Sequence, residues 1–379
     1  MRKSLYVHVP FCEQICHYCD FNKFFLKNQP VDEYVEAAVE EMKKTAAAFP
    51  QHEFIETIYI GGGTPTSLSS TQLKHLLEAI PNNFTLADTT EWTVEVNPGS
   101  ADKEKFEMIK QAGVNRLSIG AQTFDPDLLQ KINRDHKPAQ VEETIRLAQD
   151  AGIDNLSIDL MFGLPGQTME QWKDTLSQAA ALPIKHISAY SLKIEPKTVF
   201  YQMLNKGTLK LPEQELEAEM YEYMLQFLRE EGFQAYEISN FARNREESLH
   251  NLTYWDNNEY YGIGAGAHSY MDGVRRRNHG PLPKYLKAIA EDKLPYLEEN
   301  PVSRKEMMEE EMFMGLRKRL GVSKKKFENR YDQTIDQAFP GIITGLKQQG
   351  LLEETDYYIY LTETGLLLGN EVFEQFLAG

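Results

Sequence analysis

The sequence has very little cysteine and no long run of apolar residues. Its 379 residues contain three cysteines, and all three (Cys12, Cys16 and Cys19) lie within a short segment near the N-terminus. Three cysteines so close together make a poor disulfide set, so we expect reduced thiols and a cytoplasmic location. No segment approaches the roughly 18 apolar residues that a membrane span needs. The opening MRKSLYVHVPF alternates apolar with polar residues, which predicts a buried strand rather than a targeting segment.

Positive charge is also scarce. The chain has 40 Lys and Arg against 57 Asp and Glu, which gives a formal net charge of −17. A protein that binds duplex nucleic acid normally presents a basic face to the phosphates. Dense basic segments are limited to VRRRN (274–278) and RKRLGVSKKK (317–326), and we interpret both as solvated helix faces. We therefore expect no nucleic-acid partner.

An alternation of strands and helices runs through the first two-thirds of the chain. Each short β-branched apolar run is followed by a turn rich in glycine, proline or polar residues, and then by an amphipathic stretch. This alternation predicts an α/β fold, for which we expect a partial (βα)6 barrel of the TIM type, with a doubly wound sheet as the competing architecture. The expected strands are 4–11, 57–63, 91–98, 116–123, 155–162 and 186–194, and the expected helices between them are 31–49, 70–80, 102–113, 138–152 and 169–182.

A division of the chain is expected near residue 300. The alternation ends after about residue 200, and segment 293–303 has the composition of a linker. We therefore predict a barrel domain over residues 1–300 and a smaller α+β domain over residues 301–379. In the smaller domain, helices precede two short apolar runs with an acidic turn between them, which resembles a winged helix. Its acidic charge favours a protein-docking or structural role over DNA binding. The helices expected after residue 200 are 213–232, 282–292, 304–320, 323–329 and 339–349.

The clustered cysteines indicate a metal centre. Thiolates bind zinc or iron–sulfur clusters, and structural zinc takes four ligands, usually from two paired sets. His17 could complete a Cys3His zinc site, but it lies between two of the cysteines, where its side chain would diverge from theirs. An iron–sulfur cubane on three cysteines leaves one iron open, which the amino and carboxylate groups of a substrate can chelate. We therefore favour an iron–sulfur cluster and keep zinc as the alternative.

The spacing of these cysteines resembles that of a known superfamily. CxxxCxxC follows the first expected strand, Tyr18 precedes the last cysteine, and GGGTPT ends the second strand. This combination resembles the radical S-adenosylmethionine (SAM) superfamily, and within it the oxygen-independent coproporphyrinogen III oxidases and the related HemW-type haem chaperones. The resemblance covers nearly the whole chain. It implies a [4Fe-4S] cluster on Cys12, Cys16 and Cys19, with SAM bound at the open iron.

The resemblance also implies a SAM pocket at the carboxyl ends of the strands. Glycines let the backbone approach the methionyl amino group closely, and Arg134 can pair with the methionyl carboxylate as a fork. Asp159, between two apolar residues, is unlike an ordinary surface carboxylate. An electron donor such as flavodoxin or a reductase is needed if SAM is cleaved. The residues implied to bind SAM are Tyr6, Gly62, Gly63, Thr64, Glu95, Gln122, Arg134 and Asp159.

Three features distinguish the chain from the oxidases. Their pattern resembles CxxxCxFCxC, whereas Phe21 stands at the position of the additional cysteine, and only five residues precede Tyr6, where oxidases carry a substantial extension. The segment LHNLTYW resembles the HNxxYW signature of HemW-type proteins. Imidazole is a common axial haem ligand, and Tyr and Trp can flank a porphyrin face, although a histidine beside packed aromatics can also be purely structural. The expected haem-binding residues, in a segment near 249–270, are His250, Asn251, Tyr254 and Trp255, with His268 and His279 as weaker candidates.

These features together predict a HemW-type haem chaperone, which binds haem and delivers it to haem-dependent proteins. The resemblance further implies transient contact with the membrane, where respiratory acceptors lie, and a homodimer. One alternative is an oxygen-independent coproporphyrinogen III oxidase, which decarboxylates porphyrinogen propionates by radical chemistry. Another is a protein with a purely structural cluster or zinc site.

Overall fold

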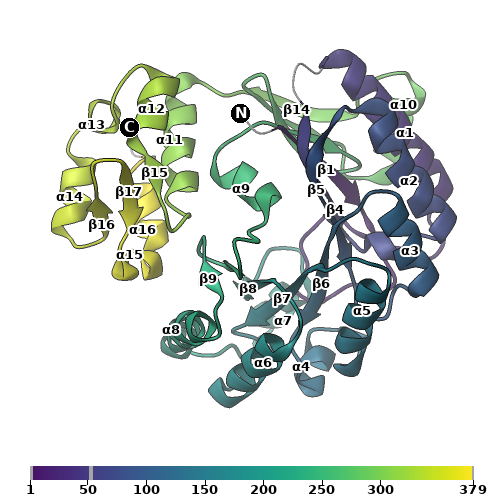
Figure 1. Cartoon of the computed structure of the whole chain (residues 1–379), viewed down its shortest axis with the longest axis horizontal. Helices are drawn as coiled ribbons and strands as arrows, with labels where there is room; N and C mark the ends of the chain where they lie inside the picture. The colour runs from purple at the N-terminus through teal and green to yellow at the C-terminus, as the bar shows by residue number, and fades with distance from the viewer. Residues whose placement is uncertain (1–2, 51–53, 378–379) are drawn as a thin grey trace.

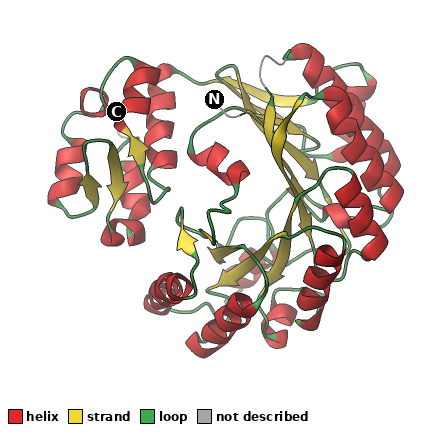
Figure 2. Cartoon of the chain, in the orientation of Figure 1, coloured by secondary structure: helices red, strands yellow, loops and turns green. Residues whose placement is uncertain are grey.

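The computed structural model describes residues 3–50 and 54–377. One mixed sheet forms the body of the molecule, and helices line its outer side (Figures 1 and 2). Its centre consists of parallel strands in chain order, with helices between successive strands. The parallel strands are β1 (Lys3–Val9), β4 (Ile55–Gly62), β5 (Leu86–Val96), β6 (Arg116–Gln122), β7 (Asn155–Phe162) and β8 (His186–Ser191). The helices between them are α1 (Val31–Ala48), α2 (Ser70–Asn83), α3 (Lys103–Gln111), α4 (Pro126–Lys131), α5 (Ala139–Asp150) and α6 (Met169–Ala181).

This arrangement confirms the predicted α/β fold. A doubly wound sheet reverses its strand order at a switch point, whereas the order β1-β4-β5-β6-β7-β8 runs in one direction. The predicted strands coincide with the observed ones to within a few residues, and the predicted helices coincide with α1, α2, α3, α5 and α6. The short helix α4 was not predicted. It has six residues and starts with Pro126 after the capping Asp125, which is too short for a helical period to show in the sequence.

The parallel strands form part of a barrel, but the sheet stays open and continues beyond them. At one edge β11 runs parallel to β1, and β12, β13 and β14 follow antiparallel; at the other edge β10 and β9 follow β8. The sequence predicted two helices in this region, over 213–232 and 282–292, but it did not predict the added strands or the other two helices. The added strands are β9 (Gln234–Ala235), β10 (Asn240–Ala242), β11 (Tyr260–Ile263), β12 (His268–Met271), β13 (Val274–Asn278) and β14 (Tyr296–Pro301), accompanied by α7 (Val199–Asn205), α8 (Gln214–Glu230), α9 (Leu249–Trp255) and α10 (Leu282–Ala290).

Two predictions about this edge of the sheet were wrong. Segment 293–303 is not a linker, because it contains β14, the edge strand that pairs with β13. The basic segment 274–278 is not a helix face, because it forms β13, where Arg276 and Arg277 pair with Glu299 and Glu298 of β14. In the second basic segment, Lys318, Arg319 and Lys324 also form ion pairs, with Asp256, Glu363 and Glu354. Carboxylates therefore neutralise much of both basic segments.

The C-terminal segment has a hydrophobic core of its own, which runs from Met312 to Phe376. The predicted helices and the hairpin are present, and their order is helix, strand, helices, hairpin. The domain boundary at residues 300 and 301 stays a prediction. The elements are α11 (Arg304–Gly315), β15 (Val322–Ser323), α12 (Lys324–Tyr331), α13 (Ile335–Ala338), α14 (Ile342–Gln348), β16 (Leu352–Glu354), β17 (Tyr358–Leu361), α15 (Glu363–Leu367) and α16 (Gly369–Glu374).

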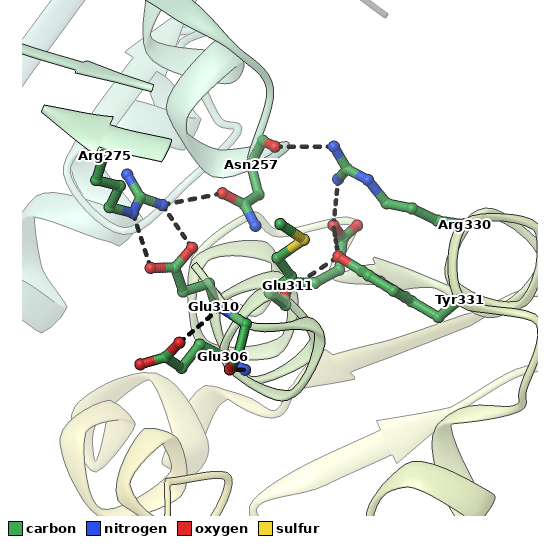
Figure 3. Close-up of polar contacts among 9 residues, drawn as sticks. Asn257, Arg275, Glu306, Glu310, Glu311, Arg330 and Tyr331 are labelled. Carbon is green, nitrogen blue, oxygen red and sulfur yellow. Dashed lines mark hydrogen bonds and ion pairs between the residues drawn. The ribbon is translucent and has the colours of Figure 1, made fainter. Parts of the chain in front are cut away.

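Polar contacts join the C-terminal segment to the large sheet (Figure 3). Arg275 of β13 donates from Nε and Nη2 to the carboxylate of Glu310 on α11, at 2.8 and 2.6 Å. Arg330 of α12 donates to the Asn257 carbonyl at 3.1 Å and to Glu311 at 2.6 Å. Because Asn257 lies two residues after α9, these contacts fix the C-terminal segment beside the end of that helix.

The two faces of the parallel strands differ in chemistry. Outward-facing residues such as Leu117, Ile119 and Leu156 belong to the main hydrophobic core beneath the helices. The alternate residues face the inner side of the sheet, and many of them are polar. The polar inner face therefore holds the candidate site.

Across the described ranges, no helix is long and apolar enough to cross a membrane.

Candidate functional site

A cavity of about 360 Å³ lies on the inner side of the parallel strands. It joins the cysteine loop to the carboxyl ends of β4, β5 and β6 and continues to residues nearer the start of β6. Most of the predicted site residues line it, which supports the prediction that they form one site without testing their roles. They are Cys12, Cys16, Cys19, Gly62, Gly63, Thr64, Glu95, Gln122, Arg134, Asp159 and Asn251. Tyr6, His250, Tyr254 and Trp255 are not part of the lining.

Backbone hydrogen bonds hold the cysteine loop against the barrel. The loop lies between β2 (Phe11–Cys12) and β3 (Phe24–Phe25), which pair with each other in parallel. At one side, Thr64 N donates to the Phe11 carbonyl at 2.7 Å. At the other side, His17 N donates to the Ile132 carbonyl at 3.1 Å. The cysteines are thus positioned by main-chain bonds to the segments that follow β4 and α4.

The thiols lie in surroundings that disfavour a bare thiolate. Burial raises the pKa of the Cys12 thiol, and it raises the pKa of Cys19 to about 11. Thr64 Oγ1 donates to Cys12 Sγ at 3.8 Å. A deprotonated sulfur here needs a positive partner, because the low-dielectric environment penalises an isolated charge. A cationic iron cluster supplies such a partner, so the donor set fits that group.

The geometry does not favour a single zinc ion. Among the described residues, no three His, Cys, Asp or Glu side chains converge closely enough to hold one metal ion. A cluster has no such requirement, since each thiolate binds a different iron. The Nδ1 atom of His17 lies 3.1 Å from the Lys131 carbonyl oxygen, and its ring packs edge-on against Phe200. His17, the fourth ligand in the zinc alternative, therefore lies outside the cavity.

The glycines after β4 are required by protein packing. A Cβ atom on Gly63 would lie 2.7 Å from the carbonyl oxygens of Val9 and Phe11. A Cβ atom on Gly62 would lie 2.3 Å from the His8 ring, and φ at Gly62 is 106°. We predicted these glycines to admit SAM, whereas the contacts show that they admit the end of β1 and the cysteine loop. Their approach to SAM stays a prediction.

Two buried carboxylates face the cavity. Burial, followed by the nearby charge of Asp159, raises the pKa of Glu95 to about 7. Glu95 accepts hydrogen bonds from Tyr59 Oη at 2.9 Å and from Gly62 N at 3.0 Å. Burial also raises the pKa of Asp159, which accepts from Ser118 Oγ at 3.0 Å. The cavity thus offers acceptors for a cationic or hydroxyl-bearing ligand.

Arg134 donates to two protein oxygens in the wall of the cavity, and its pairing with the methionyl carboxylate stays a prediction. Its Nη1 donates to Asn97 Oδ1 at 2.9 Å, and its Nη2 donates to the Gly120 carbonyl at 2.6 Å. Its Nε is buried without a partner. Asn97 in turn donates to Thr64 Oγ1 at 3.0 Å, which leads to Cys12. In this conformation Arg134 orders the wall of the cavity, and bidentate binding of a carboxylate would require both of these bonds to break.

The four predicted haem-binding residues all lie on α9 but do not face one common cavity. His250 is 1% exposed, and its ring nitrogens lie 2.9 Å from Thr57 Oγ1 and 2.9 Å from Tyr254 Oη. Trp255 instead lies under the guanidinium of Arg317, and of the four only Asn251 lines the cavity. His250 therefore has no ring nitrogen open to iron in this conformation. Ligation of haem by His250 stays a prediction that requires α9 to rearrange.

Tyr6 does not line the cavity but packs behind its wall. Its hydroxyl lies 2.9 Å from His8 Nδ1, and its ring stacks on Tyr59. Sequence reasoning also missed lining residues that lie further from the strand ends. Arg116, Ser118 and Ser188 are three of these. Because side chains alternate along a strand, the residues two, four and six positions before Gln122 share its face, and this period was readable in the sequence.

Comparison with known proteins places the chain in a family. Residues 6–179 match the radical SAM superfamily, and residues 302–368 match the HemN C-terminal domain. A protein of Bacillus subtilis (strain 168) named "Heme chaperone HemW" is 51% identical over 378 residues, covering 99% of each chain. A protein of the same name from Lactococcus lactis subsp. lactis is 44% identical over 374 residues, covering 99% of this chain and 97% of the other. The chain belongs to the HemW family.

Membership of this family confirms the resemblance seen in the sequence. A radical SAM domain uses a [4Fe-4S] cluster and SAM. The cavity of this chain brings three cysteine thiols and several polar groups together, as a site for these two cofactors requires. Among solved structures, coproporphyrinogen III oxidase (HemN) from Escherichia coli has a TM-score of 0.87, covering 99% of this chain and 90% of its own. At 24% identity, that likeness shows the fold alone.

Proposed function

We propose that this protein is a haem chaperone, which binds haem and delivers it to haem-dependent proteins. The observation that carries the proposal is the 51% identity, across 99% of both chains, to a protein named for that function. The oxidase is 24% identical, and that likeness shows the fold alone. Phe21, which is exposed beside the cysteine cavity, stands where the oxidase pattern has a further cysteine.

The cavity residues receive roles under this proposal. Cys12, Cys16 and Cys19 would hold the cluster. Glu95 and Asp159 would accept hydrogen bonds from the SAM ammonium and ribose, Arg134 would order the wall beside them, and the cofactor would approach Gly62 and Thr64. When bound and reduced, the cluster supplies an electron for cleavage of SAM. The protein's own part is to position these ligands and to exclude water. Tyr6 supports the wall through Tyr59.

The haem site belongs to α9 and the segment around it in this proposal. Asn251 reaches the cavity, and Tyr254 and Trp255 lie on the same helix. His250 is the proposed axial ligand, and it becomes available only when its bonds to Thr57 and Tyr254 open. His268, on β12, and His279 are the remaining candidates.

Substitutions on α9 test this ligand. We expect His250→Ala to weaken haem binding, because the iron loses its axial imidazole. We expect Tyr254→Phe to bind haem as tightly as the natural protein or more tightly, since it removes the hydroxyl beside His250 Nε2 but keeps the ring. Both are measured by spectrophotometric haem titration, with circular dichroism as the check on folding. An unchanged titration of a folded His250→Ala variant would move the ligand to another residue.

We also propose partners and a location for the protein. An electron donor such as flavodoxin is needed if SAM is cleaved, and a homodimer is implied by the family resemblance. The three free cysteines favour the reducing cytoplasm, with transient contact at the membrane when the acceptor is a respiratory protein.

The oxidase alternative has a direct test. Anaerobically reconstituted protein is incubated with coproporphyrinogen III, SAM and a reductant, and the porphyrinogens are separated and quantified. We expect no protoporphyrinogen above a control that lacks protein. Its formation over several turnovers would overturn the chaperone proposal in favour of the oxidase.

A further inference from the structure

A buried arginine without a partner lies inside the partial barrel. Arg116 is the first residue of β6, and it is only 1% exposed. Its Nε is buried without a hydrogen bond. Over residues 3–50 and 54–377, its guanidinium makes no hydrogen bond or ion pair with any other residue. An unpaired buried charge destabilises a folded protein, so the arrangement calls for an anionic partner.

The guanidinium faces the cavity already described. Arg116, Ser118, Gly120 and Gln122 lie on one face of β6, and all four line the cavity. A strand rises about 3.3 Å per residue, which puts the Cα atom of Arg116 about 20 Å from that of Gln122. Gln122 lies at the end of β6 that faces the cysteine loop. Along β6, Arg116 therefore lies at the end of the cavity wall away from the cysteine loop.

The neighbouring groups do not neutralise Arg116. The positive charge of Arg116 acts to lower the pKa of Asp159. The Asp159 carboxylate nevertheless accepts hydrogen bonds from Ser118 Oγ, at 3.0 and 3.2 Å, and none from Arg116. His186, packed against the same region, cannot serve, because burial and then the charge of Arg116 hold its pKa well below the ordinary value. Tyr236 also lies near, and burial keeps its phenol protonated. Of these groups only Asp159 supplies negative charge, and it forms no direct ion pair with Arg116, which leaves the guanidinium N–H groups for an anionic ligand.

A second donor reaches this part of the cavity from α9. Asn251 lines the cavity together with Arg116, and its Nδ2 makes only a long hydrogen bond, 3.5 Å, to Asn240. A guanidinium offers two parallel N–H groups that match the two oxygens of a carboxylate. Arg134 offers them only if the bonds from both of its Nη atoms to protein oxygens break. Arg116 and Asn251 therefore both offer the cavity N–H groups that protein oxygens leave largely unoccupied.

We propose that Arg116, assisted by Asn251, binds a propionate carboxylate of the tetrapyrrole inside the partial barrel. The inference rests on the proposed function, since haem carries propionates on its edge. The methionyl carboxylate of SAM is a poorer candidate, because SAM that chelates the cluster is bound at the other end of the cavity.

Esterified haem separates this role from other contributions to binding. We would titrate the natural protein and the variants Arg116→Gln and Arg116→Lys with haem and with haem dimethyl ester, in dilute detergent. The natural protein should bind haem about tenfold to a hundredfold more tightly than the diester. Arg116→Gln should bind both equally, and Arg116→Lys should keep part of the preference. The matched control is Arg146→Gln, an exposed arginine paired with Asp150 on α5, which should behave as the natural protein does.

Two further measurements exclude other roles for Arg116. Arg116→Gln without ligand should unfold at the same temperature as the natural protein or higher, because the substitution removes an unpaired buried charge. A clear loss of thermal stability would make Arg116 a structural residue and overturn the proposal. Binding of SAM and of decarboxylated SAM should be unchanged by Arg116→Gln. A preference for SAM that disappears in this variant would assign the carboxylate site to SAM instead.

The outcomes also distinguish this inference from the proposed function. If the natural protein binds haem and Arg116→Gln keeps the full preference for haem over the diester, the inference is wrong and the chaperone proposal stands. If the natural protein binds no haem, the proposed function fails and the inference fails with it.

Discussion

Replacing Cys16 by serine is expected to abolish assembly of the iron–sulfur cluster while the fold is retained. A serine oxygen is a far poorer ligand for iron than a thiolate, and three ligands leave no spare donor. The bonds that hold the cysteine loop are main-chain bonds at neighbouring residues, such as His17 N to Ile132, and they do not depend on the thiol. Iron and sulfide per chain after anaerobic reconstitution should therefore fall to near zero, with an unchanged far-ultraviolet circular dichroism spectrum.

His17→Ala is the matched control for this experiment. His17 lies one residue from Cys16, but its ring contacts the Lys131 carbonyl and Phe200 rather than the cavity. We expect this variant to reconstitute with the iron content of the natural protein. Full iron content in Cys16→Ser would contradict the proposed ligand set. A loss of metal in His17→Ala as complete as that in Cys16→Ser would restore the four-ligand zinc alternative.

Replacing Gly63 by alanine is expected to displace the cysteine loop. The added Cβ would lie 2.7 Å from two carbonyl oxygens, those of Val9 and Phe11, and main-chain atoms cannot swing aside as a side chain can. The same carbonyl groups accept hydrogen bonds from Gly63 N at 2.8 Å and Thr64 N at 2.7 Å, which join β4 to the loop. We expect a cost of about 1–3 kcal/mol in the free energy of unfolding, together with loss of most of the reconstituted iron.

Gly345→Ala serves as the control in the same two measurements, urea unfolding and iron content. Gly345 lies within α14, and a Cβ atom there would meet nothing within 4 Å beyond the helix's own backbone. Alanine should stabilise this helix by roughly 0.5–1 kcal/mol and leave the iron content unchanged. If Gly63→Ala matched the natural protein in both stability and iron, the close packing described for this loop would be wrong.

The parallel strands and the position of the cavity could be predicted because their signals are local. The run NLSIDLMF is rich in apolar residues, as expected for a buried strand, and β7 begins and ends where that run does. Residues at the ends of parallel strands meet at one edge of the sheet, which agrees with the places of Glu95, Gln122 and Asp159 that the family resemblance implied.

The edge strand β14 could not be predicted, because its stabilisation is not local. Its residues are mostly exposed, two of the six are glutamates, and it ends in proline, so it carries no alternating apolar pattern. It is held instead by cross-strand pairs such as Arg277 with Glu298, whose partners lie 21 positions apart in the sequence. A segment stabilised in this way reads as a linker until its partner strand is located.

The surroundings of His250 show the same limit within the site. Its two ring partners are Tyr254, one helical turn away, and Thr57, which lies 193 positions away on β4. A motif indicates which residues share a helix, but it does not indicate which of them face the cavity. Arg116 was missed for a different reason. The alternation of side chains along β6 puts it on the inner face, but it is the first residue of the strand, and site residues were sought only at the carboxyl ends.

Transfer of haem to an acceptor tests the central claim most directly. Anaerobically reconstituted protein is loaded with one equivalent of haem and mixed with increasing concentrations of a haem-free respiratory haem protein, and the acceptor's Soret band is followed in time. The account predicts saturable haem binding and a transfer rate that rises with acceptor concentration, because haem passes within a complex of the two proteins. A rate that is independent of acceptor concentration, or the absence of saturable haem binding, would contradict it.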